Sequence, residues 1–522
     1  MYELTEERVV PVSAPKAAAA PSYGAFGNRR LLWTAIVIFA VTAWFSEGFI
    51  HPDEHFQILE FANYKLGRTP SADLQWEFPA ELRPGLQPML GFGFIRAAEA
   101  VGLASPFMQV FVIRLITGFL SLAVFLAWSR ALRRLPESRQ AGERLPWLVA
   151  FLWFVPFLSV RFSSENLAAL TFWAGLLLII RGLFGIDVTR GRAALLSLAG
   201  GSLLGLSFYF RFQMGFALVG AAAWIGWQLA TRRQGRVPVR NLFLVLVGAA
   251  AAAALGTLAD YWLYGELVFT PYRYLDTNLL HGKAAEFGAS PWWWYFQRIG
   301  LREGPPIGLL LLGLAAVGLW SHRRHVMAWV FIPFVCGHLL IAHKELRFLF
   351  PMLLPFLVLA LFGFDRLAAL RPGRLVMAGV YLVGALAVGA NFVLLPARSL
   401  LPPEERVRCF RFLYGLSRTQ PLVLFSENSS IYQWNFLTYH FYRDDRIQSV
   451  VVGDPQEGME RAASVPGGLW VSRSAAIDVP RDLQAHLIYG YLPWRPDWNW
   501  LTRGENRYYV WSVQRRAVIA VQ

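Results

Sequence analysis

Long apolar stretches alternate with short polar segments from residue 31 to residue 394. Most stretches approach the ~20 residues that a helix needs to cross the hydrocarbon core of a bilayer, and the shorter ones can borrow flanking residues or tilt. We therefore predict a polytopic α-helical membrane protein with about 11 transmembrane helices. The stretches cover residues 31–49, 108–129, 147–160, 166–183, 194–210, 213–230, 241–259, 305–320, 326–342, 347–364 and 375–393.

Arginine is concentrated in every second polar segment. Cytoplasmic loops of membrane proteins are enriched in Lys and Arg, so we expect these segments and the tail 1–30 to face the cytoplasm. The intervening segments, which include the loops 51–107 and 260–304, are then expected on the outer face. The basic residues of the inner segments are Arg130, Arg133, Arg134, Arg139, Arg144, Arg181, Arg190, Arg192, Arg232, Arg233, Arg236, Arg240, Arg323, Arg324, Arg366, Arg371 and Arg374.

The composition agrees with a membrane protein. Hydrophobic residues make up 56% of the chain and charged residues only 16%, against about 25% charged residues in soluble domains. The net charge of +15 comes mainly from the arginines between the apolar stretches, so it reports topology and makes membrane lipids the expected partners. No stripe of Lys and Arg marks a soluble segment, which argues against a nucleic-acid partner.

The last segment, residues 395–522, has a different pattern. It is polar and contains short β-type runs at 422–425, 447–452, 469–472 and 508–513, with room for helices between them. We predict that it forms a small extracytoplasmic α/β domain after a transmembrane domain of residues 31–394.

Within the first outer loop, residues 87–104 are amphipathic. A further crossing there would invert the charge bias of all later loops. We therefore expect this piece to be a helix that lies on the membrane surface.

Two histidines and two carboxylates follow the first apolar stretch directly. Ionisable groups are costly beside hydrocarbon and mark functional sites there. Proline followed by two acids also favours a helix start, but this explanation leaves the histidines and the glutamine unaccounted for. A carboxylate here can act as a general base, and its neighbour can orient it or raise its pKa. We expect Asp53 and Glu54 to be catalytic and His51, His55 and Gln57 to bind substrate.

The same histidines, four residues apart with acids between them, also allow a metal site. Pro52 follows the first histidine directly, and the H-E-x-x-H pattern of zinc enzymes is absent. We therefore favour a metal-independent site with no cofactor, and a divalent ion stays the open alternative.

A second polar cluster ends a later apolar stretch on the same expected face. It contains three potential cations, His343, Lys344 and Arg347, with Glu345 among them. Snorkelling explains one such side chain, but three together run against the charge bias of the outer face. Arginine with its bidentate geometry and lysine as a point charge suit a phosphate. Arg211, at another outer helix end, is expected to join this anion pocket.

A base and an anion pocket beside the lipid predict a reaction in which a group attached to a lipid phosphate passes to a hydroxyl. Trp76 and the aromatic run 292–295 lie in the outer loops, where they could stack on a sugar or anchor the protein at the interface. A transporter or flippase of lipid-linked sugars is the alternative. It would favour polar groups near the midplane and inverted repeats, neither of which we find.

Residues 51–57, H-P-D-E-H-F-Q, and residues 343–351, H-K-E-L-R-F-L-F-P, resemble the two signature motifs of glycosyltransferase family 22. This family contains the mannosyltransferases of GPI-anchor and N-glycan assembly, and the H-P-D-E form looks most like the GPI branch. The resemblance extends over roughly the part of the chain that precedes the polar C-terminal segment. Its supporting residues are Trp76, Glu77 and Arg83, then Arg211 and Gln213, then Asp260, Tyr264, Gly265 and Asn278.

The resemblance implies a GT-C fold and a polyprenyl- or dolichyl-phosphate-mannose donor. It also implies an inverting transfer, without a nucleotide sugar, that makes an α-mannoside on a glycan or glycolipid acceptor. Carried over from related GT-C enzymes, Asp53 is the base and Glu54 the second choice, while His343, Lys344 and Arg347 face the donor phosphate.

The other matching residues, from Trp76 to Asn278, are expected to bind substrate. The Arg/Ala/Leu-rich sequence favours a bacterial inner membrane with a periplasmic active site. In a eukaryotic cell the same site would face the lumen of the endoplasmic reticulum.

Overall fold

The computed structural model describes residues 29–185, 188–231, 237–302, 304–370, 373–490 and 507–516. Almost all of the expected cytoplasmic tail lies outside these residues, as do Arg232, Arg233, Arg236 and Arg371 of the inner segments.

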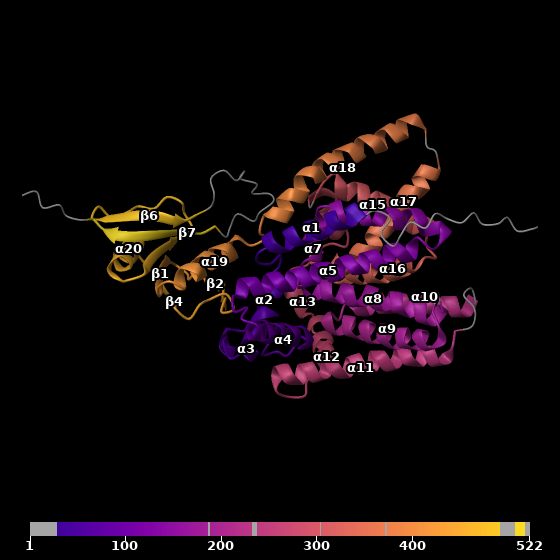
Figure 1. Ribbon diagram of the computed structural model, residues 1–522, viewed down its shortest axis with the longest axis horizontal. Helices are drawn as coiled ribbons and strands as arrows, with labels where there is room; N and C mark the ends of the chain where they lie inside the picture. The colour runs from indigo at the N-terminus through magenta and orange to yellow at the C-terminus, as the bar shows by residue number, and fades with distance from the viewer. Residues whose placement is uncertain are drawn as a thin grey trace, which may run out of the picture.

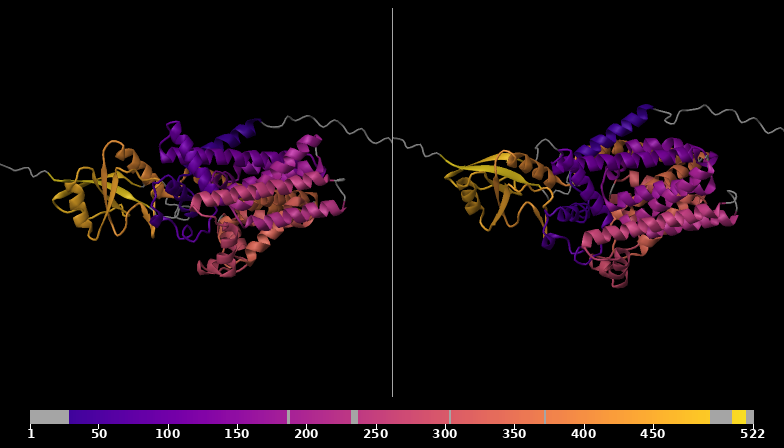
Figure 2. Two further views of the ribbon diagram at one scale, coloured as in Figure 1. Left: turned by 90° about the horizontal axis from the view of Figure 1, so that it is seen from below. Right: turned by 60° about the horizontal axis from the view of Figure 1, so that its bottom comes forward.

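Every apolar stretch that the sequence marks as a crossing contains a helix, and most of these helices run side by side in one bundle (Figures 1 and 2). Seven described helices are long and apolar enough to cross a membrane, and α15 and α16 are shorter. The class is therefore confirmed, and the count of crossings stays a prediction. The bundle helices are α1 (Arg29–Phe45), α5 (Pro106–Leu132), α6 (Arg139–Phe151), α7 (Phe154–Ser159), α8 (Ser164–Phe184), α9 (Arg190–Phe210), α10 (Met214–Thr231), α11 (Val239–Tyr264), α15 (Ile307–Ser321), α16 (Val326–Leu340), α17 (Leu353–Ala369) and α18 (Arg374–Leu400).

Small residues let the central helices approach closely, as is common in membrane bundles. On α9, a Cβ at Gly201 would overlap the backbone of Val245 on α11. On α11, a Cβ at Gly248 would overlap the carbonyl of Leu198 on α9. The two glycines therefore bring the backbones of these helices into direct contact.

One predicted crossing, residues 147–160, is divided into α6 and α7. Pro156 has no N–H to give to the carbonyl of Leu152, so the helix breaks one turn before the proline. Asn391 of α18 bridges the break, since its Nδ2 donates to the Phe151 carbonyl at 2.7 Å and its Oδ1 accepts from Trp153 N–H at 2.9 Å. An amide side chain thus satisfies the backbone groups that the break would leave unpaired inside the bundle.

The loops that the charge bias predicts on the outer face, called the outer loops below, are folded against one end of the bundle. The first loop forms the short α2 (Asp53–Phe56), α3 (Leu59–Lys65) and η1 (Ser71–Asp73), followed by α4 (Leu86–Ala100). Helix α4 confirms the expected helical piece, and it packs on α3 and α11. Its contact with a membrane surface stays a prediction. The later segments are α12 (Thr270–Leu275), η3 (Asp276–Leu280), α13 (Lys283–Glu286), α14 (Trp294–Gln297), η4 (Arg298–Arg302) and η5 (Leu346–Met352).

The C-terminal segment forms a five-stranded sheet with the order β4-β1-β5-β7-β6, next to the first outer loop (Figure 1). Strand β1 is parallel to β4 and β5, and β7 is antiparallel to β5 and β6. The small α/β fold is therefore confirmed, whereas the domain limits and the outward orientation stay predictions. Its elements are α19 (Glu405–Ser417), β1 (Leu422–Glu427), β2 (Gln433–Trp434), β3 (Leu437–Thr438), β4 (Ile447–Val452), α20 (Pro455–Ser464), β5 (Gly468–Ser472), β6 (Leu483–Tyr489) and β7 (Tyr509–Arg515).

Strand β6 is absent from the sequence prediction. It is an edge strand, and most of its side chains are exposed or half-buried. A strand that is not enclosed on both faces carries a weak hydrophobic pattern, which explains the omission.

Candidate active site at one end of the helix bundle

The two polar motifs, nearly three hundred residues apart in the chain, meet in the structure. Asp53 Oδ2 lies 2.8 Å from Nη2 of Arg347. Next to this pair, His51 Nε2 lies 3.3 Å from Oε2 of Glu345. The potential base of the first motif is therefore in direct contact with a cation of the second.

Arg347 is the centre of this charge network. Besides Asp53, its guanidinium contacts Glu345 through Nε and Glu165 Oε1 through Nη1 at 3.4 Å. Glu165, which is almost fully buried, also pairs with Arg211 Nη1 at 2.9 Å. Carboxylates and guanidiniums thus alternate, as buried charges require if each is to have a partner.

A second guanidinium approaches Asp53 from the first outer loop. Arg83 Nη2 lies 3.6 Å from Asp53 Oδ2 and 2.7 Å from Glu77 Oε1, and Gln57 donates to the other oxygen of Glu77. Burial raises the pKa of Glu77 against the lowering effect of Arg83. Asp53 therefore lies between two guanidiniums, and the second of them is held by Glu77.

Local structure explains which side chains reach this site. Pro52 precedes the first turn of α2, where its fixed φ fits a helix start. Asp53 and Gln57 are one helical turn apart, so they share a face, and both line the same cavity. His55 points elsewhere, onto Glu60.

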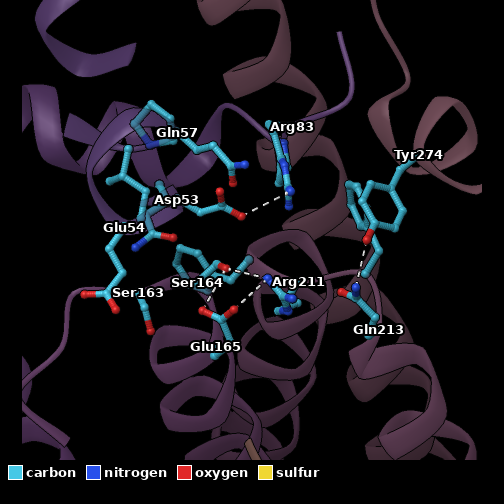
Figure 3. A pocket seen from close by; sticks show the side chains of 16 residues that line it. Asp53, Glu54, Gln57, Arg83, Ser163, Ser164, Glu165, Arg211, Gln213 and Tyr274 are labelled. Carbon is cyan, nitrogen blue, oxygen red and sulfur yellow. Dashed lines mark hydrogen bonds and ion pairs between the residues drawn. The ribbon is translucent and has the colours of Figure 1, made fainter. Parts of the chain in front are cut away.

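The cavity beside α2 has a volume of about 520 Å³ and opens to solvent. Figure 3 shows Asp53 facing Arg83, the pair of Glu165 and Arg211 below them, and Gln213 bonded to Tyr274 at the side. Carboxylates, guanidiniums and amides converge here, which suits a ligand that is both anionic and rich in hydroxyls.

The two neighbouring acids of α2 have opposite pKa shifts. Burial alone would raise the pKa of Asp53, but Arg347, His51 and Arg83 together hold it well below its usual value. Burial raises the pKa of Glu54, and Arg161 only partly opposes it. In the second motif, Arg347 and His51 overcome burial and lower the pKa of Glu345 to about 2. Two carboxyls with different environments can take different roles in acid–base chemistry.

The remaining residues of the second motif have local partners. Lys344 is buried, and its Nζ donates to the carbonyl of Ile341. His343 Nε2 lies 2.8 Å from Glu345 Oε1. Of the motif's three potential cations, Arg347 alone has a contact with Asp53 among the described residues.

Two other expected substrate-binding residues have partners in the loops, and their part in substrate binding stays a prediction. Asp260 on α11 accepts from Gly85 N–H at 2.7 Å and from Thr270 Oγ1 at 2.6 Å, which joins the two outer loops to one helix end. Asn278 Nδ2 donates to the carbonyl of Tyr274, 3.2 Å away. Neither residue lines the cavity.

Trp76 lies beside the charge network and outside the cavity lining. Its ring stacks on Phe287 of the second loop with centroids 6.0 Å apart, and Phe287 also contacts the ring of His343. In the run 292–295, Trp292 and Trp293 are exposed and Tyr295 is buried.

Sequence reasoning missed several residues of the site. Glu165 pairs with Arg211 and Arg347. The sequence indicates it only through its position at the end of an apolar stretch, on the same expected face as Arg211. Tyr274 lines the cavity and bonds Gln213, but a tyrosine in an aromatic-rich loop carries no distinctive signal. Within the described ranges, no group of three or more His, Cys, Asp and Glu is arranged to hold a metal ion, and metal independence stays a prediction.

Comparison with known proteins bears on both the family and the fold. A sequence model described as the Alg9-like mannosyltransferase family matches residues 31–398. GPI mannosyltransferase 3 of Yarrowia lipolytica is 29% identical over 343 residues, which cover 62% of this chain and 61% of that protein. GPI alpha-1,2-mannosyltransferase 3 of Danio rerio is 34% identical over 134 residues, covering 25% of this chain and 24% of that protein. The chain thus aligns with about three-fifths of the length of the first of these relatives.

Among solved structures, ArnT from Cupriavidus metallidurans bound to undecaprenyl phosphate superposes with a TM-score of 0.52 at 12% identity. The match covers 92% of this chain and 97% of ArnT. At this identity the likeness concerns the fold alone, and it confirms the expected GT-C architecture.

Proposed function

The chain belongs to the Alg9-like mannosyltransferase family, and from that membership we propose that it transfers mannose from a lipid-phosphate donor to a hydroxyl of a glycan or glycolipid at the outer face of a membrane. Its relatives named GPI mannosyltransferases support the sugar and the type of acceptor. The undecaprenyl phosphate bound to ArnT, which shares the fold, supports a polyprenyl-phosphate donor.

One observation carries the proposal: the ion pair of Asp53 and Arg347 at one end of the helix bundle. It puts a proton acceptor and an anion-binding group in contact, beside a cavity that also exposes Arg83 and Arg211. A glycosyl transfer from a phosphate needs both groups within reach of one carbon atom.

In the proposed reaction, the acceptor oxygen attacks C1 of the mannose and forms the new glycosidic bond. The bond between C1 and the phosphate oxygen breaks, and its electron pair stays on the departing lipid phosphate. Asp53 takes the hydroxyl proton, and Arg347, Arg83 and Arg211 stabilise the phosphate. Attack opposite the leaving group inverts the configuration at C1.

The pairing of Asp53 with two guanidiniums lets the entry of the donor change the strength of the base. A donor phosphate competes with Asp53 for Arg347 and Arg83 because guanidinium groups bind phosphate as well as carboxylate. Each guanidinium that turns to the phosphate stops lowering the pKa of Asp53. The carboxylate then becomes a better base when the donor is in place.

Glu54 is the second choice for the base. Its pKa is already raised by burial, and it also borders the cavity. Asp53 is preferred because it contacts Arg347 and Arg83 directly, whereas Glu54 accepts from the backbone N–H of Ile50.

The test is product formation from a synthetic short-chain polyprenyl-phosphate mannose and an alkyl α-mannoside in detergent. We expect the wild-type protein to make a disaccharide glycoside, and Asp53→Asn to lose about 100-fold or more in kcat, as general-base loss does. Asp73→Asn, in the same loop but paired with His440, is the matched control. Full loss in Glu54→Gln with activity retained in Asp53→Asn would move the base to Glu54.

An absence of product with every acceptor glycoside and lipid length would overturn the proposal. If the intact donor lipid moved from one leaflet of a proteoliposome membrane to the other and no glycoside formed, the protein would instead be a flippase.

Cellular location is part of the same proposal. The arginine-rich segments between the outer loops support a cytoplasmic opposite face, and with it a periplasmic site in a bacterial inner membrane. The orientation is tested in spheroplasts with Phe436→Cys, a substitution at an exposed position of the C-terminal segment. The cysteine is labelled with a thiol reagent that does not cross membranes. Labelling only after lysis would contradict it.

A further inference from the structure

A second cavity lies on the opposite side of α2 from the first. It encloses about 390 Å³ when the space open to solvent is included, and it is bordered by α5, by the turn before α2 and by the C-terminal segment. Glu54 lines both cavities, and it is the one residue common to the two linings in the described part of the chain. Helix α2 therefore forms a partition, with Asp53 on one side and His55 on the other.

Two buried polar atoms at the second cavity have no hydrogen-bond partner among the described residues. They are Nδ1 of His55, whose side chain is 1% exposed, and Nε of Arg161, whose side chain is 2% exposed. Both residues line the cavity. Buried polar atoms are nearly always satisfied, so such atoms beside an empty space indicate a ligand or water that bonds to them.

The partners of these two residues hold them in place. His55 Nε2 lies 2.8 Å from Glu60 Oε1, and the two remaining nitrogens of Arg161 donate to the carbonyls of Gly48 and Ser46. His55 and Arg161 therefore present their unpaired atoms from fixed positions. A rigid polar frame of this kind favours a ligand with directed hydroxyl groups.

The C-terminal segment supplies one wall of the second cavity. The Tyr442 ring stacks on His55 with centroids 5.2 Å apart and an interplanar angle of 12°. The backbone next to it is fixed, because buried Glu60 accepts from the N–H groups of His440 and Phe441 at 2.9 and 3.0 Å. This wall belongs to a part of the chain that the family match, ending at residue 398, does not cover.

We infer that the second cavity binds the terminal hexose of the acceptor, and that Tyr442 gives the C-terminal segment a direct part in selecting it. The inference rests on the proposed transfer reaction. Phe49, Phe162 and Tyr442 form the aromatic part of the cavity wall, while Glu54 and the unpaired atoms of His55 and Arg161 offer partners for the hydroxyls of a sugar.

The arrangement divides the two substrates between the two faces of α2. The lipid phosphate lies with Arg83 and Arg211, and the acceptor sugar lies with Arg161 and Tyr442. Its reacting hydroxyl extends past Glu54, the shared wall, to the side of α2 where Asp53 and the donor lie. Two substrates on opposite sides of the reacting carbon are what an inverting displacement requires.

Filling the cavity tests the inference. Ile113 on α5 lines the second cavity and not the first. We expect Ile113→Phe to raise the KM for octyl α-mannoside roughly tenfold or more, with little change in the donor KM, since only acceptor binding is obstructed. The matched control is Ile116→Phe, on the same helix, where the side chain is 47% exposed. Val110→Met, which fills the same cavity with a flexible side chain, is the second variant in case the phenylalanine strains the core.

Each outcome decides the question. An unchanged acceptor KM in a variant that still binds farnesyl phosphate places the acceptor elsewhere and overturns the inference. If the wild-type protein makes no product at all, the proposed reaction fails. Binding of octyl α-mannoside, followed by thermal shift in the wild-type and Ile113→Phe proteins, then still shows whether the cavity is a sugar site. Binding that the phenylalanine abolishes supports the site, and binding that it leaves intact excludes it.

Discussion

Removing the proposed base should strengthen phosphate binding. The guanidinium of Arg347 is bound to Asp53 at 2.8 Å and Arg83 is close by. A lipid phosphate must displace this carboxylate and tolerate its negative charge. Asp53→Asn removes both obstacles but keeps the shape of the side chain, so the variant should bind polyprenyl phosphate more tightly than the wild-type protein while losing turnover.

The structure sets the size of the effect. A hydrogen bond between two charged groups contributes about 1.5–3 kcal/mol, and a neutral amide retains part of it. The phosphate therefore regains about 1–2 kcal/mol, which is roughly a 5- to 30-fold lower Kd. The gain is expected at neutral pH, where Asp53 is ionised because Arg347, His51 and Arg83 outweigh its burial and keep its pKa low.

Farnesyl phosphate titrated into detergent-solubilised protein, by calorimetry or thermophoresis at constant ionic strength, measures this difference. Asp73→Asn is the control, since Asp73 lies in the same loop but pairs with His440 at 2.7 Å, away from the cavity. Equal or weaker phosphate binding by Asp53→Asn, in a protein that melts like the wild type, would refute the competition for Arg347.

Three further predictions concern stability. Glu345→Gln should cost about 3 kcal/mol at neutral pH, because Arg347 outweighs burial and lowers the pKa of this carboxyl from 4.5 to about 2. A carboxyl with a lowered pKa stabilises the folded protein above pH 4.5, and this contribution is lost as the pH falls toward 2. The difference in melting temperature between the wild-type protein and Glu345→Gln should therefore shrink between pH 4.5 and 2. A difference that stays constant over this range would contradict the prediction. Gly85→Ala should cost about 2 kcal/mol or more, since its Cβ would overlap the carbonyl of Ala259; wild-type melting would show that the loop yields. Glu60→Gln should weaken the attachment of the C-terminal segment by about 2–3 kcal/mol, because a carboxylate that accepts from two backbone N–H groups of that segment is lost. Limited proteolysis should then cut between bundle and sheet faster, and unchanged protection would contradict this.

The positions of the bundle helices could be predicted from the sequence. In lipid, an apolar segment of near-spanning length must pair its own backbone N–H and C=O groups. A helix pairs these groups within the one segment. The exception, the break between α6 and α7, depends on Asn391, whose amide comes from a helix more than two hundred residues away. Pro156 indicates from the sequence where the helix breaks, but only the packing shows that Asn391 pairs the backbone groups at the break.

The two motifs could also be found from the sequence, because ionisable residues at the end of an apolar stretch are conspicuous. The sequence could not assign their partners. The ammonium of Lys344 bonds the carbonyl of Ile341, a partner that the sequence does not indicate, and its place beside the phosphate stays a prediction. His55 was grouped with the acids around it, yet its place on α2 turns it toward Glu60 and the second cavity.

The sequence by itself therefore determined the membrane class, the helix positions and the chemistry available at one end of the bundle, since these follow from composition and spacing along the chain. Only the tertiary structure decided which carboxylate meets which guanidinium, and that a short helix separates two cavities. Those outcomes depend on distances between segments far apart in the chain, and hydrophobic periodicity contains no record of them.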